Sequence, residues 1–191
     1  DVKVTGSVTG NNDVAGIVNK IDEDGKIENV AFIGKINSVG NNSTVGGIAG
    51  SNYMGFVNRA YVDATITANN ANASMLVPYV TYMLNSWKSG TKARVTNSVA
   101  KGVLDVKNTR YVGGIVAKTW PYGAVQDNVT YAKVVKGQEI FASNDVDDED
   151  GGPYIKDLFG VIGYSSAEDG TGRDTKSPKK LKHLTKEEAD K

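Results

Sequence analysis

Apolar and polar positions alternate in a segment that recurs along the chain. Four copies align at residues 27–36, 57–66, 95–104 and 125–134, and a fifth copy at residues 2–8 lacks its front part. Small or apolar residues mostly fall at offsets 0, +3, +5, +7 and +9 from each start. Offsets +5, +7 and +9 show the alternation of a β-strand, and the extra step before them predicts a corner. The +7 residue is always very small: Gly34, Ala64, Gly102 or Ala132.

A second, Gly-rich apolar motif follows each copy of the first. Its copies start at Val14, Val45, Ala73, Val112 and Leu158, as in the run Val-Gly-Gly-Ile-Ala-Gly from Val45. The interval to the next repeat is 12 or 13 residues except after Ala73, where it is 22. We therefore expect one insertion near residues 79–92 and another between residues 134 and 158.

The repeat predicts an all-β fold in which successive copies stack on each other. A strand, a turn and a second strand cannot bury a face alone, whereas stacked copies build a continuous apolar column. Parallel crossovers are right-handed, so we expect a right-handed parallel β-helix of about five coils with two insertions. A β-sandwich is the alternative, and it predicts no fixed period. Asn29 and Asn97, both at offset +2, are expected to bond corner backbone groups as in an Asx turn.

Composition and charge agree with this fold and exclude several classes of protein. Val and Ile together number 35 against 6 Leu, with 22 Gly and 17 Asn, and this balance favours strands. The net charge is zero, so we expect no nucleic-acid partner. No apolar run approaches the roughly 20 residues that span a bilayer, so no membrane insertion is expected. The chain has no Cys and a single His, which excludes disulfides and any metal site that needs two imidazoles.

The two motifs together carry a resemblance to known proteins. Val-Gly-Gly-Ile-Ala-Gly and Val-Gly-Gly-Ile-Val, paired with Ile-x-Asn-Val-x-Phe-x-Gly-x-Ile, resemble the GLUG-type repeats of bacterial surface proteins. With the acidic insertion at residues 144–152 and the tail at residues 177–184, the whole chain resembles the non-catalytic repeat region of streptococcal immunoglobulin A proteases. The resemblance implies a secreted, cell-wall-associated zinc metallopeptidase that cleaves the immunoglobulin A heavy chain at its hinge. The partners it implies are that heavy chain and the adjacent domains of the protease.

The chain does not contain the chemistry that this family uses. The family's signature is His-Glu-x-x-His, and His183 is the sole histidine here, followed by Leu-Thr-Lys-Glu. We therefore expect no catalytic residue, no metal ligand and no cofactor in this chain, with zinc held elsewhere in the larger protein. We expect a β-helix domain over residues 1–172, and a linker and the start of a truncated helix over residues 173–191. The first repeat lacks its corner and the capping box at Thr185 opens a helix near the end, so we expect a piece of a longer protein.

Acidic residues offer two candidate sites, both weak. Asp145, Asp147, Glu149 and Asp150 could bind calcium, but the EF-hand template fails at its sixth and twelfth positions, and a solvated loop is the simpler interpretation. Glycosidases on β-helices need carboxylates that converge on one groove. Glu28, Asp63 and Asp105 do not share a register, so this class of enzyme is disfavoured.

Aromatic residues give the strongest surface signal. Tyr53 and Trp120 each lie eight residues after the start of a second motif, which predicts the same corner two coils apart. The intervening insertion adds further rings, so we predict a partner-binding edge. Its residues would be Tyr53, Tyr82, Trp87, Trp120 and Tyr122. The alternative is that these rings cover the ends of the core.

Two functional hypotheses follow. The first is a module that positions the antibody substrate or gates the protease domain. The second is an adhesin-type repeat module that binds a host glycan or protein directly.

Overall fold

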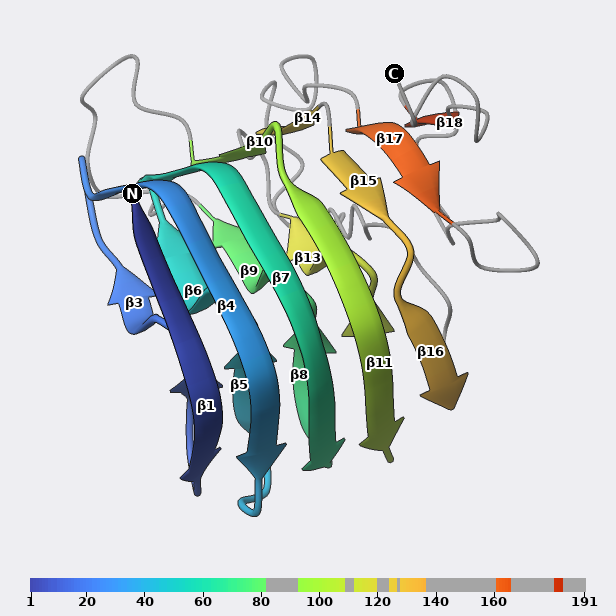
Figure 1. Ribbon diagram of the computed structural model, residues 1–191. Coiled ribbons are helices and arrows are strands. Elements are labelled where there is room, and N and C mark those ends of the chain that lie inside the picture. Colours follow the sequence, from blue (N-terminus) through green and yellow to red (C-terminus); the bar gives the residue numbers. More distant parts are fainter. Residues whose placement is uncertain are drawn as a thin grey trace, which may run out of the picture.

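The computed structural model describes residues 1–81, 93–108, 112–119, 124–126, 128–136, 161–165 and 181–183. Within them the chain winds as a helical coil whose parallel strands form three sheets (Figure 1). Every strand pairing is parallel. No helix in these ranges is long and apolar enough to cross a membrane.

The long sheet carries the repeat found in the sequence. Its main strands are β1 (Val2–Gly10), β4 (Lys26–Ser38), β7 (Phe56–Asn69), β11 (Val99–Lys107) and β15 (Asn128–Thr130). The shorter strands of the same sheet are β10 (Arg94–Thr96), β14 (Ala124–Gln126), β16 (Lys133–Lys136), β17 (Val161–Ser165) and β18 (Leu181–His183).

Two smaller sheets close each coil behind the long one. The second sheet contains β2 (Val14–Ala15), β5 (Ser43–Gly46), β8 (Ala71–Ser74) and β12 (Val112–Gly113). The third contains β3 (Val18–Ile21), β6 (Ala49–Tyr53), β9 (Val77–Thr81) and β13 (Val116–Thr119). In Figure 1 the long strands run down the front, the chain returns behind them, and successive coils shift to the right. This advance is right-handed, so the predicted right-handed parallel β-helix of about five coils is confirmed.

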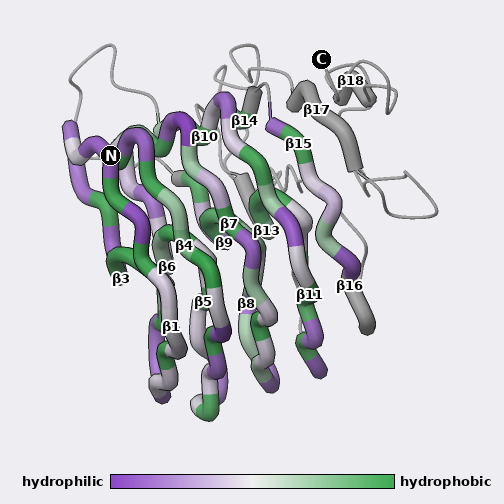
Figure 2. The backbone as a smooth tube through the Cα atoms, viewed as in Figure 1, coloured by the Kyte–Doolittle hydropathy of each residue, from purple (hydrophilic) through white to green (hydrophobic). Residues whose placement is uncertain are grey.

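Register matches the predicted alignment of the repeats. Phe32 lies between Val4 and Val62 on neighbouring strands, and Ile36 lies between Val8 and Ile66. Figure 2 shows the resulting alternation of hydrophobic and hydrophilic positions along the long strands. The inward side chains of the middle coils are fully buried, as for Phe32, Ile36, Val62 and Ile66.

The very small +7 residues have a specific cause. Gly34 and Gly102 adopt φ of 156° and 109°. A Cβ on Gly34 would overlap the carbonyl oxygen of Gly6, and a Cβ on Gly102 would overlap that of Ala64. Backbone of the preceding coil therefore occupies the space that a side chain would need.

Left-handed residues form the corners of the long sheet, inside β4 and β7 and between β10 and β11. Asn29, Arg59 and Asn97 have φ of 51° to 53°, in the region where Asn is tolerated better than most residues. The Nδ2 of Asn97 donates to Oδ1 of Asn58 in the preceding coil at 2.9 Å. This bond of Asn97 goes to a side chain of the preceding coil and not to corner backbone, so it connects two coils.

A second asparagine corner uses the same device. Asn42, Asn70 and Asn108 all have φ between 50° and 59°. Nδ2 of Asn70 donates to Oδ1 of Asn42, and Nδ2 of Asn108 donates to Oδ1 of Asn69, each at 3.1 Å. Seven of the 17 asparagines thus belong to these corners or bond to them across coils.

Two expectations about the repeat need correction. Offset +3 holds Ser98 and Asn128 in two copies, and both are buried. The Asn128 side chain bonds the Val95 carbonyl and the Ser98 amide at 2.8 and 3.0 Å, and Ser98 Oγ accepts from the Ala60 amide at 3.0 Å. This inward position tolerates polar side chains because every group is paired.

The last copy of the second motif also departs from the prediction. The run from Leu158 was expected to stack on the run from Val112. Instead β17 lies beside β15 in the long sheet, with Gly163 opposite Asn128. A short β-branched segment fits any open parallel edge, so its composition does not determine which sheet it joins.

Candidate functional site

The carboxylates on the long sheet do not converge. Glu28 lies beside Asn58, Asp63 beside Lys101, and Asp105 beside Thr67. The predicted lack of a common register for Glu28, Asp63 and Asp105 is confirmed. Within the described ranges no group of three or more His, Cys, Asp or Glu side chains could hold a metal ion. The candidate calcium ligands Asp145, Asp147, Glu149 and Asp150 lie outside those ranges.

The predicted aromatic edge is described at one residue. Tyr53 ends β6 and is half-buried, while Tyr82, Trp87, Trp120 and Tyr122 lie outside the described residues. The Lys20 ammonium lies 4.8 Å from the centre of the Tyr53 ring and 2.7 Å from a carboxylate oxygen of Asp22. The hydrogen bond to Asp22 raises the pKa of Lys20. Both charged side chains are well exposed, so this pair contributes little stability.

An aromatic and charged cluster lies on the outer face of the long sheet, and the sequence did not single it out. The Lys101 ammonium sits 5.8 Å from the centre of the Tyr61 ring and 5.7 Å from that of Tyr131, within the range of cation–π attraction. Asp63 lies beside Lys101 on the adjacent strand. Burial raises the pKa of Tyr61, and the charge of Asp63 and a hydrogen bond to its carboxylate act in the same direction.

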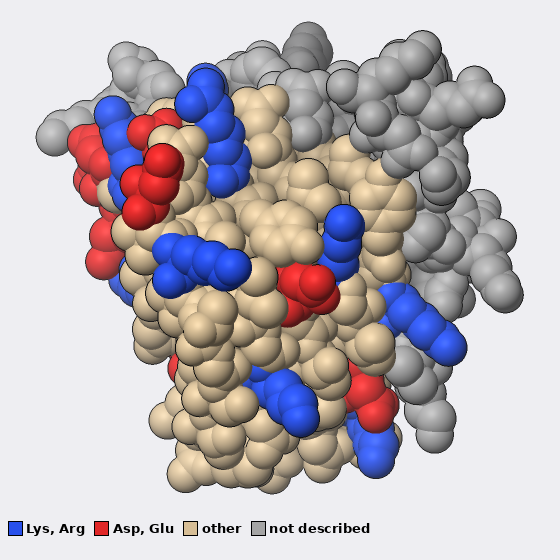
Figure 3. All heavy atoms as spheres, viewed as in Figure 1, with Lys and Arg blue, Asp and Glu red and all other residues tan. Residues whose placement is uncertain are grey.

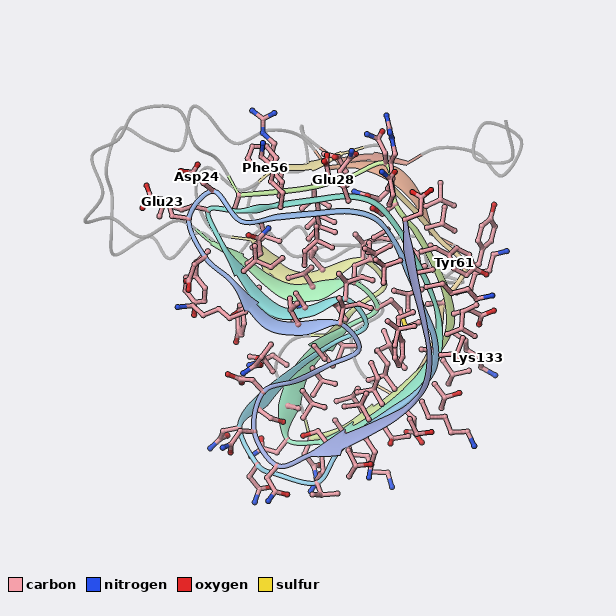
Figure 4. All side chains as sticks on the ribbon, turned by 60° about the vertical axis from the view of Figure 1, so that its left-hand side comes forward. Glu23, Asp24, Glu28, Phe56, Tyr61 and Lys133 are labelled. Atoms are coloured by element: carbon pink, nitrogen blue, oxygen red, sulfur yellow. The ribbon has the colours of Figure 1, made fainter. Side chains whose placement is uncertain are left out.

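The outer face around this cluster carries more positive than negative charge. Tyr61 and Lys133 project from it, on the far side of the corner from Glu28 and Phe56 (Figure 4). Lys and Arg side chains are spread over this face, with fewer Asp and Glu among them (Figure 3). The outward lysines of its described strands are Lys3, Lys35, Lys101, Lys107 and Lys133, against Asp63 and Asp105. The alternation of β7 and β11 could have revealed these rows once their register was known.

The described part of the predicted linker, residues 181–183, is a short strand. β18 runs parallel to β17, and His183 lies opposite Gly163. The capping box predicted at Thr185 lies outside the described residues.

Comparison with known proteins places this geometry in context. The chain is 52% identical over 160 residues to the zinc metalloprotease ZmpB of Streptococcus pneumoniae, a match that covers 82% of this chain. It is 32% identical over 148 residues, 73% of its length, to the zinc metalloprotease ZmpC of the same organism. The matched region spans 8% of the length of each relative. No protein-family model and no solved structure matches the chain, so the likeness to GLUG-type repeats stays a prediction.

Proposed function

Because the chain is homologous to one region of streptococcal zinc metalloproteases, we propose that it is a non-catalytic module of such an enzyme. It positions the antibody substrate relative to the protease domain, or it gates access to the cleft of that domain. The observation that carries the proposal is the 52% identity to a region of ZmpB, in a chain whose single histidine cannot form a His-Glu-x-x-His site. Zinc and the peptidase chemistry belong to another part of the larger protein.

The geometry suits a rigid spacer. Neighbouring coils contact each other through in-register strands, and the middle coils also through bonded asparagine corners, so the stack has few internal hinges. In repeat architectures of this kind, stability is a sum of coil and interface contributions, and the number of coils sets the distance that the module spans. The partners are then the adjacent domains of the protease and the immunoglobulin A heavy chain, in a secreted, cell-wall-associated protein.

Two surfaces are available for the antibody. One is the predicted edge around Tyr53, Tyr82, Trp87, Trp120 and Tyr122. The other is the outer-face cluster, where Tyr61 and Tyr131 flank Lys101. Aromatic side chains anchor many protein interfaces, and this supports a docking role for the tyrosines of either surface.

The test compares two substrates of the larger protease. Removal of the region equivalent to residues 1–172 is expected to lower kcat/KM on intact immunoglobulin A by about 10-fold or more, a loss of docking energy of about 1.4 kcal/mol. Cleavage of a short hinge peptide, which needs no docking surface, should change less than about 3-fold. An equal loss on both substrates would contradict a positioning role.

Two further measurements separate the surfaces and the chemistry. Trp87→Ala with Trp120→Ala tests the predicted edge, and Tyr61→Ala with Tyr131→Ala tests the outer face; unchanged antibody cleavage removes the surface concerned. The chain by itself should show no metal-dependent cleavage of immunoglobulin A. Cleavage by the chain alone would refute the non-catalytic assignment.

An adhesin-type module is the second candidate. The lysine between two tyrosines favours it, because such a cluster could bind a host glycan or protein without any protease domain. It predicts saturable binding of the chain to a host surface component other than immunoglobulin A, lost in Tyr61→Ala and Tyr131→Ala.

A further inference from the structure

One end of the stack presents three strands whose second edge is open. β1, β2 and β3 stand at the ends of the long, second and third sheets, each with a strand partner on one side. The ladder from β1 to β4 is continuous over nine residue pairs, from Val2 beside Val30 to Gly10 beside Ser38. Backbone donors and acceptors on the other side of β1 are therefore arranged as a regular template.

β1 carries one edge lysine, Lys3, but lacks the other devices that proteins use to protect such an edge. Exposed edges are commonly blunted by proline, a bulge or an inward-pointing charge. β1 contains no proline, and its ladder shows no register shift. Its inward row is Val4, Gly6 and Val8, and its charged residue, Lys3, belongs to the outward row. A strand of nine residues in this state is suited to accept another strand.

Gly6 gives the strongest indication of what the edge accepts. It has φ of 147°, close to the 156° of Gly34 in the next coil. At Gly34 that conformation makes room for the Gly6 carbonyl, and at Gly102 for the Ala64 carbonyl. At Gly6 no atom lies within 4 Å of the position that a Cβ would take. Gly6 thus has the backbone conformation that makes room for a neighbouring coil, although no coil lies on that side.

The surrounding surface agrees with this interpretation. Val4 and Val8 are half-buried, whereas Phe32 and Ile36 in the same rows are fully buried. Val2 is 55% exposed. An open groove of about 360 Å³ lies where β1 begins next to its partner β4, lined by Asp1, Val2, Lys3, Asn29, Val30 and Ala31. The apolar rows therefore run out to this edge uncovered.

We propose that the free edge of β1 is a strand-addition site for a parallel polypeptide strand with the chain's own repeat chemistry. The incoming strand carries apolar residues beside Val4 and Val8 and a small residue beside Gly6. The carbonyl of that small residue occupies the open space next to Gly6. Its source is another segment of the larger protease, because the site continues the interface between coils and the matched region is 8% of the length of each relative. The inference depends on this interface and not on the antibody substrate.

The probe is a labelled synthetic peptide with the sequence of Lys26–Ser38, the strand that already pairs with β1 on its other side. Titrated against the chain, it should bind saturably and slow hydrogen exchange of β1 amides, with β7 and β11 unchanged. The control peptide carries proline at the position of Gly34, where proline removes a donor and interrupts the ladder. Equal binding of both peptides, or no saturable binding of the first, would overturn the proposal.

Variants of the chain locate the site. Val8→Glu places a charge in the inward row of the edge and should weaken peptide binding by about 10-fold or more. Ser7→Glu adds the same charge to the exposed outward row of the same strand and should change binding less than about 3-fold. Gly6→Ala fills the space reserved for the carbonyl and should abolish binding. Native exchange protection of β7 and β11 in each variant shows that the stack remains folded.

Two outcomes would redirect the inference. Equal weakening by Ser7→Glu and Val8→Glu would indicate general charge repulsion and contradict strand addition. Concentration-dependent self-association that competes with the peptide would replace the proposed source with a second copy of the chain. Loss of the antibody-positioning function would leave the peptide result unaffected, so the two proposals fail independently.

Discussion

The first coil and the middle coils follow the same pattern but lie in different surroundings. Gly6 and Gly34 share a row and a backbone conformation, yet a side chain at Gly34 would overlap the Gly6 carbonyl, whereas the space at Gly6 is open. Val4 is half-buried where Phe32, in the same row, is fully buried. The stability of a coil in this fold therefore depends on its neighbour as much as on its own residues.

Phe32 against Val4 is the comparison with the largest expected effect. Phe32→Ala should lower the free energy of unfolding by about 3–5 kcal/mol, because it removes a fully buried ring between two coils. Val4→Ala should cost about 1 kcal/mol, since the edge residue is only partly covered. Urea unfolding followed by circular dichroism measures both values. Equal costs would show that the edge coil is as well packed as the interior.

Gly34 against Gly6 tests the backbone contact between coils. Gly34→Ala should cost about 3 kcal/mol, combining strain at positive φ with overlap against the Gly6 carbonyl. Gly6→Ala shares the strain but meets no atom, so about 1–2 kcal/mol is expected. The same urea titrations measure the difference. A larger loss at Gly6 than at Gly34 would contradict the open edge.

The rows of the long sheet were predictable because strand alternation and the repeat period report on the same inward positions. Phe32, Val62 and Ala100 align in the structure as they do in the sequence. Side chains that meet across coils were not predictable in the same way. Lys101 and Tyr61 are 40 residues apart, and their contact depends on the register between coils, not on either local pattern.

Polar positions in the core, and the last strands, escaped prediction for a related reason. Asn128 at offset +3 looks like a surface residue, and its burial follows from partners at Val95 and Ser98 in the preceding coil. The strand Val161–Ser165 has the composition of either motif, and only the available edge at β15 determined its sheet. Of the predicted aromatic edge, Tyr53 is placed on β6.

The buried Asn128 and the exposed corner residue Asn42 should differ less in their contributions to stability. Asn128→Ala should cost about 2 kcal/mol, because the Val95 carbonyl and the Ser98 amide each lose the partner that Asn128 supplies in a buried site. Asn42→Ala removes one exposed bond and a favourable left-handed residue, so about 1 kcal/mol is expected. Thermal and urea unfolding of the two variants measure the difference. Equal losses would indicate that backbone conformation, and not burial, determines how much these asparagines contribute to the free energy of unfolding.

The outer-face cluster should give the smallest effect, one that depends on pH. Burial and Asp63 raise the pKa of Tyr61 above its ordinary value of 10.0. Below pH 10 the phenol is protonated in both folded and unfolded chains, so its contribution to stability is fully present. As the pH rises above 10, the unfolded chain loses this proton first, and stability falls until the pH passes the raised folded pKa. Tyr61→Phe should therefore remove part of the loss of stability that wild type shows between pH 9 and 11 in urea unfolding.

Asp63→Asn divides the causes of this pH dependence. It removes the carboxylate but leaves the ring buried, so the loss above pH 10 should shrink without vanishing, because burial is the larger cause. A pH dependence in Asp63→Asn equal to that of wild type would assign the shift to burial alone. A pH dependence equal to that of Tyr61→Phe would make Asp63 its main source. In that case the pH dependence of Tyr61 would come mainly from its contact with Asp63 on the outer face of the long sheet.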